Sequence, residues 1–228
     1  MLKILPSPSA MNQYYDCHSH MMAPPSKDSL VINNMYTGFE DAGKGSPCSL
    51  GIHPWHIDNH VHDLYTLTKY LNLPNVWAVG ECGLDKVRGA EWAVQLIVFR
   101  KQIGLANSYG KPLMVHCVRA FEELLMEMTL HPAVIPVVIH GFNNKKEVAR
   151  RLLAQGFYLS FGSALCKPGS QAATVLRNMP ADRILLETDD AVIPIKDIYS
   201  MAADIRKTDA NDLILQVRAN FKKVFKHD

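Results

Sequence analysis

Short apolar runs alternate along the chain with longer stretches in which apolar residues recur every three to four positions. The short runs predict eight strands, and the longer stretches predict helices after several of them. Because this alternation is typical of βα units around a parallel sheet, we predict an α/β protein, a (β/α)8 TIM-type barrel. The predicted strands cover about residues 15–20, 30–36, 48–51, 76–80, 112–116, 137–140, 158–161 and 184–187, and the predicted helices 62–71, 91–109, 121–128, 145–155, 169–178 and 209–225.

The stretch between the first and third predicted strands lacks helical periodicity. It is rich in proline and glycine, which interrupt regular structure. We therefore expect the first two crossover helices to be reduced to loops, so that the barrel is trimmed on one side. The last helix, 209–225, is expected to close or flank the wall. The breaking residues are Pro24, Pro25, Gly38, Gly43, Gly45 and Pro47.

The overall composition is that of a globular protein. The 228 residues suit one barrel, so we expect a single hydrolase domain over 1–228. Apolar residues make up 48% of the chain and charged residues 20%, and no run is long enough to span a membrane. The N-terminal segment lacks the apolar core of a signal peptide, which predicts a cytoplasmic location. No feature of the sequence specifies an oligomeric state.

The five cysteines form no CxxC pair and no even framework, which favours a reducing compartment. Cys17, Cys82 and Cys117 each lie beside a candidate metal ligand. Since strand neighbours point to opposite faces, we expect these thiols to be small buried apolar groups and not ligands. The formal net charge of +2 gives no sign of a long nucleic-acid-binding surface, although a few phosphate contacts within a cleft stay compatible with it.

Several apolar runs finish in a histidine or carboxylate that a buried strand has no packing reason to carry. In a barrel the carboxyl ends of the strands converge on the active site, so these side chains are expected to meet. Imidazole and carboxylate ligands suit one or two divalent ions such as Mg, Mn, Zn or Fe, and composition does not choose between them. The six candidate metal ligands are His18, His20, Glu81, His116, His140 and Asp189.

The candidate ligands predict hydrolysis by metal-activated water. His18 and His20 are two residues apart in an extended segment and therefore project to one face. Glu81 lies between Gly80 and Gly83 of the GECGLD run, where the glycines leave space for a carboxylate that bridges two ions. Two such ions generate a hydroxide and clamp the oxygens of a phosphoester.

Two catalytic residues are expected within the ligand set, Glu81 as the bridge and Asp189 as a ligand that also takes the proton of the attacking water. Asp190 is expected to face elsewhere. Asp85 is a candidate for orienting a ligand from behind it.

Other polar residues near the strand ends have both a binding and a structural interpretation. His53 could donate to a substrate phosphate or brace its loop. Asn143 could contact phosphate or cap a helix, and Trp55 could stack on a base or cover the barrel mouth. We expect His56, like the two histidines that follow it, to face solvent.

The motifs together resemble the TatD family of metal-dependent deoxyribonucleases, in the same order over nearly the whole chain. The resemblance rests on DCHSH, GIHPWHI, AVGECGLD, VHC, IHGF and LLETD. It implies an amidohydrolase-like barrel, one or two divalent ions and hydrolysis of DNA phosphodiesters, often from the 3′ end. Carried over by motif, the ligands fall on the same six residues, with Glu81 as the bridge.

The chain departs from the family pattern in ways that make it a shortened, divergent member. The family's arginine two residues after the strand 5 histidine is replaced by Val118, and Arg119 follows one place later as a candidate substrate contact. Proline does not follow the strand 8 aspartate until Pro194. The segment between His20 and His53 is shorter than the family's.

Three functions are compatible with these residues. The first is a deoxyribonuclease, with a 3′ to 5′ exonuclease as the first hypothesis. The second is an amidohydrolase that attacks a small amide, lactone or phosphotriester with the same barrel and ligands. The third is a catalytically silent relative that binds metal without turnover. The expected partner is therefore DNA or a small phosphoester substrate, and no membrane.

Overall fold

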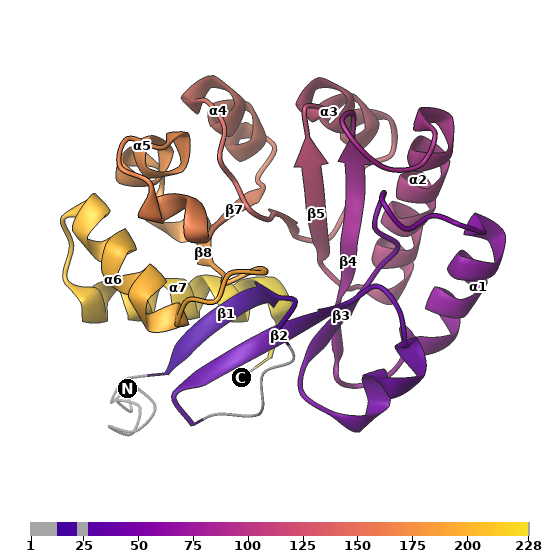
Figure 1. The fold of residues 1–228 in the computed structure, drawn as a ribbon, viewed down its shortest axis with the longest axis horizontal. Coiled ribbons are helices and arrows are strands. Elements are labelled where there is room, and N and C mark those ends of the chain that lie inside the picture. The colour runs from indigo at the N-terminus through magenta and orange to yellow at the C-terminus, as the bar shows by residue number, and fades with distance from the viewer. Residues whose placement is uncertain (1–12, 22–26, 228) are drawn as a thin grey trace, which may run out of the picture.

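An eight-stranded parallel sheet curls into a nearly closed barrel at the centre of the fold (Figure 1). The computed structural model describes residues 13–21 and 27–227. The strands pair in sequence order, and a bridge between Ser19 and Asp189 joins the exit of the last strand to the first. The predicted (β/α)8 fold class is confirmed. The strands are β1 (Tyr14–Ser19), β2 (Ser29–Met35), β3 (Cys48–Leu50), β4 (Val76–Asp85), β5 (Leu113–Val118), β6 (Val137–Ile139), β7 (Tyr158–Phe161) and β8 (Ile184–Leu186).

Helices pack on the outside of the barrel in an arc from α1 to α6 (Figure 1). All six predicted helices are present to within a few residues, but α6 was not predicted. Its sequence carried a usable signal, because Ile198, Tyr199, Ala202 and Ala203 recur with helical spacing and are buried. The helices are α1 (His60–Tyr70), α2 (Trp92–Tyr109), α3 (Phe121–Leu130), α4 (Lys146–Ala154), α5 (Gln171–Asn178), α6 (Ile195–Arg206) and α7 (Ala210–Phe225).

The first two connections are reduced as the proline and glycine pattern predicts. Within the described residues, the β1–β2 connection contains no helix, and the β2–β3 connection contains only a 3-10 helix, η2 (Phe39–Lys44). Figure 1 shows β1 and β2 along the lower edge, away from the arc of helices α1 to α5. In the described ranges, the connections after β1 and β2 therefore contribute no α-helix to this side of the barrel.

Two layers of apolar side chains hold the barrel together. The larger layer lies between the strands and the outer helices. The smaller one fills the barrel interior with one or two side chains from most strands, among them Cys17, Ala78 and Met114, and α7 adds Phe221 and Phe225 to it. The last helix therefore closes the barrel at the end opposite the strands' carboxyl ends. No helix in the described part of the chain has the length and apolar character of a membrane span.

An ion pair between α2 and α3 makes a testable contribution to the stability of the fold. The carboxylate of Glu127 is fully buried and accepts two 2.7 Å hydrogen bonds from the Arg100 guanidinium. These bonds hold the pKa of Glu127 below its ordinary value near 4.5. We expect Arg100→Met to lower the free energy of unfolding by about 1 kcal/mol at pH 7, since the arginine is 40% exposed and solvent screens part of the interaction.

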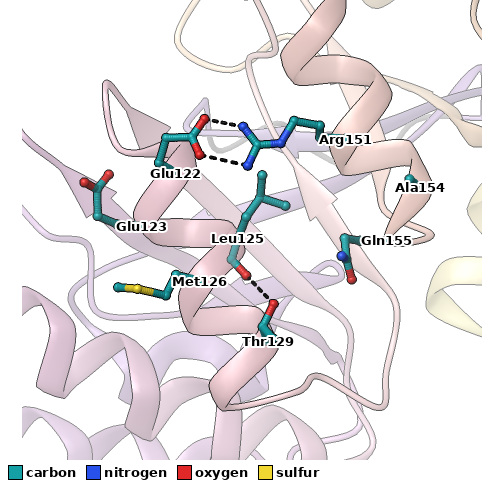
Figure 2. Close-up of a pocket in the computed structure, with 8 residues that line it drawn as sticks. All are labelled: Glu122, Glu123, Leu125, Met126, Thr129, Arg151, Ala154 and Gln155. Atoms are coloured by element: carbon teal, nitrogen blue, oxygen red, sulfur yellow. Dashed lines mark hydrogen bonds and ion pairs between the residues drawn. The ribbon is translucent and has the colours of Figure 1, made fainter.

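This loss should depend on pH with a defined sign. A carboxyl whose pKa is lower in the folded state stabilises the fold fully above pH 4.5, and its contribution is lost as the pH falls through the folded-state value. Urea unfolding of the wild type and of Arg100→Met, at pH 7 and at a pH below 4.5, measures the difference in the free energy of unfolding. Arg151→Met is the matched control, because the Arg151–Glu122 pair between α3 and α4 is exposed (Figure 2). An equal loss in both variants, or one unchanged by pH, would contradict the assignment.

Candidate metal centre

The carboxylate of Glu81 lies at the centre of five imidazoles near the carboxyl ends of the strands. Its Oε2 atom is 3.3 Å from His18 Nε2 and 3.2 Å from His20 Nε2. Its Oε1 atom is 2.7 Å from His140 Nε2, 3.0 Å from His116 Nδ1 and 3.1 Å from His53 Nε2. The two oxygens thus face two groups of nitrogens, which adjoin each other at His18 and His140.

Asp189 joins the first of these groups. Its Oδ1 atom is 3.6 Å from His18 Nε2 and 3.4 Å from His20 Nε2. One ligand atom from each of these three residues falls within a 4.8 Å span, and the same holds for one atom each from His53, Glu81 and His116. The structure therefore brings all six predicted ligands together. His18, His20 and Asp189 lie near the Oε2 atom of Glu81, and His116 and His140 lie near its Oε1 atom.

A bulge in β4 explains why Glu81 points inward. Val79 pairs with Leu113, but the next pair is Cys82 with Val115, so the β4 side gains one residue. Ala78 faces the interior, and simple alternation would send Glu81 outward with Val79. The extra residue reverses which side chains face the interior, so that Glu81 points inward. Bulges near active sites commonly redirect a side chain in this way.

Gly80 and Gly83, on either side of Glu81, make room for the neighbouring strand β5 and not for the carboxylate itself. A Cβ at Gly83 would lie 1.9 Å from the carbonyl oxygen of His116, and φ there is +148°. A Cβ at Gly80, where φ is also +148°, would lie 2.5 Å from the carbonyl oxygen of Met114. Only glycine lets β5 approach this closely, and this approach sets His116 beside Glu81.

The first strand is bulged in the same way, and it is tied to the exit of β8. The pairing of β1 with β2 shifts between Asp16 and Ser19. The buried Asp16 carboxylate accepts hydrogen bonds from Thr188 Oγ1 (2.7 Å) and Thr188 N (3.1 Å). Next to it, Asp189 N donates to His18 O and His20 N donates to Asp189 O. These bonds hold His18, His20 and Asp189 in one rigid unit.

Burial raises the pKa of Asp16 to about 7, against the lowering effect of its hydrogen bonds with Thr188. Burial acts on Glu81 in the same direction, but there the surrounding histidines outweigh it and lower the pKa.

Two further carboxylates orient the histidines of the second group. Asp85 was expected to do so, and its Oδ2 atom lies 3.1 Å from His116 Nε2 and accepts a 2.7 Å hydrogen bond from Trp55 Nε1. Glu187 was missed by the sequence analysis. Its buried Oε1 accepts a 2.6 Å hydrogen bond from Gly141 N and lies 3.5 Å from His140 Nδ1. The available signal was a carboxylate directly after the apolar run of β8.

The charges in the cluster favour a cation between the carboxylates and the imidazoles. Burial and the nearby His140 ring disfavour a charged His18, yet Asp189 and Glu81 raise the pKa of His18 to about 9. Burial likewise opposes ionisation of Glu81, but the surrounding histidines hold its pKa well below the ordinary value. Both nitrogens of the buried His18 ring have no well-oriented hydrogen-bond partner among the described residues. Unpartnered buried imidazole nitrogens beside carboxylates fit a divalent metal ion.

His53 differs from the other imidazoles in its hydrogen bonds. Its Nδ1 atom accepts a hydrogen bond from Trp55 N at 3.1 Å. In the neutral ring the proton is then on Nε2, which faces Glu81 Oε1. Burial lowers the pKa of His53 despite the Glu81 carboxylate, which favours this neutral form. His53 therefore donates toward Glu81 through Nε2 and accepts a hydrogen bond within its own loop through Nδ1.

A cavity of about 310 Å³ opens over the cluster. Asp190 lines it, so our expectation that this residue faces elsewhere was wrong. His56 is exposed as expected but also lines the cavity. The lining residues are His20, Tyr36, His53, Trp55, His56, Glu81, His116, His140, Asp189 and Asp190. A larger hollow of about 580 Å³ lies between α3 and α4 (Figure 2), but none of the candidate ligands lines it.

Two predicted substrate contacts lie outside the cavity lining. Arg119 is exposed directly after β5, with a left-handed backbone at φ 52°. Asn143 follows β6, and its Oδ1 accepts a 3.0 Å hydrogen bond from Ala172 N in the first turn of α5. Asn143 thus caps a helix, though a different one from the helix that follows it in sequence.

The cysteines beside the ligands are not part of the cluster. Cys82 is buried and Cys117 half-buried, both in the outer apolar layer, as alternation predicts. Cys17 faces the barrel interior, as alternation from Tyr15 predicts, and its Sγ lies 3.0 Å from Ser160 Oγ. The β1 bulge turns the next residue, His18, to the same side. All five cysteines are free thiols. Burial raises the pKa of Cys82 and of Cys17, which makes both poor thiolate ligands.

The contact between Asp85 and His116 leads to a quantitative prediction. We expect Asp85→Asn to weaken metal binding or lower kcat/KM by about 10- to 100-fold, the usual cost of losing a carboxylate behind a metal-binding histidine. The asparagine keeps an acceptor for the Val87 and Arg88 N–H groups but loses the charge that faces His116. Metal titration and steady-state kinetics measure the effect. Wild-type values for both would show that Asp85 only shapes its loop.

The imidazoles and carboxylates at the strand ends of this barrel define the class of metal-dependent hydrolases. Comparison with known proteins gives the family. The profile of the family described as TatD related DNase matches residues 21–226. The chain belongs to this family, as its motifs predicted.

Individual relatives agree with the family assignment. An uncharacterized metal-dependent hydrolase of Buchnera aphidicola is 30% identical over 78% of this chain and 73% of its own length. A 3′-5′ ssDNA/RNA exonuclease TatD of Erwinia billingiae is 29% identical over 77% of this chain and 76% of its own length. The crystal structure of YjjV, a TatD homologue from Escherichia coli, superposes with a TM-score of 0.85 at 22% identity and covers 96% of this chain and 100% of its own. This last likeness shows the shared fold.

Proposed function

We propose that this chain cleaves DNA phosphodiester bonds with two divalent ions held on either side of Glu81. The single observation that carries the proposal is the division of the imidazoles between the two Glu81 oxygens. A carboxylate between two sets of nitrogens suits a bridge between two ions. One position would use His18, His20 and Asp189 with Oε2, and the other would use His116 and His140 with Oε1.

Ions at these positions would supply an activated water and neutralise charge on the phosphoryl oxygens. The side chains of the protein do the remaining work. Asp189 is partly open to the cavity, and only its Oδ1 faces the histidine pair, so its other oxygen accepts the proton that the attacking water loses. His53 donates its Nε2 proton to a phosphate oxygen. Asp85 and Glu187 hold the rings of His116 and His140.

The proposed substrate is a DNA end, attacked in the 3′ to 5′ direction. The name of the Erwinia billingiae relative supports both the nucleic-acid substrate and the direction. The cavity of about 310 Å³ is at the lower end of the range for small-molecule sites, so it suits one nucleotide at the strand terminus better than a duplex. Arg119, outside the cavity, would contact phosphates further along the strand. The cavity size also favours a small ester or phosphotriester as the second candidate.

The test is a substrate panel offered to metal-stripped protein with Mg²⁺, Mn²⁺ or Zn²⁺ added back. It contains single-stranded DNA labelled at either end, a lactone and a phosphotriester. Shortening of 5′-labelled DNA one nucleotide at a time supports the proposed exonuclease. Turnover of the lactone or phosphotriester without DNA cleavage would replace it by the small-molecule hydrolase. Metal binding without any turnover would identify a silent relative.

A further inference from the structure

Two aromatic rings at the open side of the cavity have no packing role that explains them. Tyr36 directly follows β2, and His56 lies in the turn after β3. The two rings stack with their centroids 4.7 Å apart and an interplanar angle of 13°. Both line the cavity, and neither belongs to the apolar layers of the barrel. Tyr36 stays 42% exposed although one face of its ring is stacked on His56.

The backbone fixes where this pair stands. Met35, the residue before Tyr36, pairs with Leu50 at the end of β3. On the other side, His56 N donates a 2.9 Å hydrogen bond to His53 O, which closes the turn that also orients His53. The pair is therefore held by two neighbouring strand ends. Both side chains are exposed, so the outer surface of the pair is reachable from solvent.

The pair also stands beside both groups of candidate ligands. The Tyr36 ring centroid is 6.2 Å from that of His20, which faces Glu81 Oε2. The His56 centroid is 5.8 Å from that of His53, which faces Glu81 Oε1. A phosphodiester at Glu81 would place the base of an adjoining nucleotide within reach of these rings. A flat, partly exposed aromatic surface next to a phosphate-cleaving centre suits the face of a base.

We propose that Tyr36, backed by His56, is a stacking platform for an unpaired base next to the scissile phosphate. This inference rests on the proposed nuclease function and adds to it a base-binding site. Inside a duplex both faces of a base are already stacked on neighbouring base pairs, so the platform favours strands whose bases are unpaired. Because every base has an aromatic face, the selection is independent of sequence.

The kinetic test compares Tyr36→Ala and Tyr36→Phe on two single-stranded DNA substrates with Mn²⁺ present. One substrate is ordinary DNA, and the other has abasic residues at its 3′ end with the same phosphodiesters. Stacking of one base corresponds to about 5- to 150-fold in affinity. We expect Tyr36→Ala to raise KM by a factor in this range on ordinary DNA with little change in kcat, and to leave the abasic substrate unchanged. Tyr36→Phe keeps the ring and should behave as wild type.

A binding measurement is independent of turnover. With metal-stripped protein, a 2-aminopurine base at the 3′ end of the strand should lose fluorescence on binding, and Tyr36→Ala should abolish this quenching. Tyr65→Ala is the matched control, since Tyr65 is a 72% exposed tyrosine on α1 outside the cavity lining. Circular dichroism verifies the fold of each variant.

The outcomes separate the two proposals. Equal loss on both substrates, or no loss in Tyr36→Ala, overturns the platform while the nuclease stands. Failure of the wild-type protein to cleave either substrate with any metal overturns the nuclease function and the platform together. Base-dependent loss with retained cleavage of the abasic strand supports both.

Discussion

Glu81→Ala is expected to lower kcat/KM for DNA cleavage by at least about 10⁴-fold while the protein remains folded. The carboxylate faces five imidazoles and is the only group placed between the two sets of candidate ligands in the described chain. Removing it takes a ligand from both proposed ions, and the lost charge stabilisation of several kcal/mol corresponds to this factor. Single-turnover cleavage of labelled single-stranded DNA measures the loss.

The fold should survive this change. The backbone N–H of Glu81, which donates a 2.7 Å hydrogen bond to Asn34 Oδ1, is unaltered in the variant. Circular dichroism and thermal unfolding check this point. Glu122→Gln, a carboxylate change on the outer surface of α3, is the control and should keep wild-type activity. Full activity in a folded, metal-stripped and reconstituted Glu81→Ala protein would exclude the bridge.

Asp189→Asn is expected to reduce kcat by about 10²- to 10⁴-fold with a much smaller effect on KM. Asparagine keeps the size of the side chain but neither takes the proton of the attacking water nor supplies a negative ligand oxygen. Its backbone bonds with His18 and His20 do not involve the side chain and should hold the residue in place. Steady-state kinetics on DNA measure the effect.

Metal binding on the Oε1 side of Glu81 is the control for this prediction. His116 and His140 do not depend on Asp189 for position, because Asp85 and Glu187 lie beside their second nitrogens. Metal binding on that side of Glu81 should therefore persist in Asp189→Asn. A normal kcat in the variant would show that another group takes the proton.

The sequence predicted the barrel and its ligands because both follow from local patterns. Seven of the eight predicted strands end within two residues of the observed end, while β4 continues to Asp85. The carboxyl ends of parallel strands must converge. The six ligands could be read off those ends. The reduced connections after β1 and β2 followed from proline and glycine in the same way.

The phase of the side chains could not be predicted, because it depends on pairing between strands. The bulges in β1 and β4 turn His18 and Glu81 inward against simple alternation. The approach of β5 to Gly83 is likewise a property of two strands and not of one.

Contacts made across the barrel mouth were also beyond the sequence. Glu187 meets Gly141 and His140 from another strand exit, and Tyr36 meets His56 only because β2 and β3 end side by side. Glu187 lies in the LLETD run and Tyr36 directly after an apolar run, but neither position indicates which residue of another strand it contacts. The prediction of Asp85 as an orienting group succeeded because that residue shares a strand with Glu81.

The most direct test of the central claim counts ions against activity. Metal-stripped protein is titrated with Mn²⁺, bound metal is measured after equilibrium dialysis, and cleavage of single-stranded DNA is followed at each point. Because candidate ligands lie on both sides of Glu81, we predict that each chain binds two equivalents of Mn²⁺ and that cleavage appears as the second equivalent binds. Full cleavage by the metal-stripped protein, or with a single bound equivalent, would contradict a centre in which Glu81 bridges two ions.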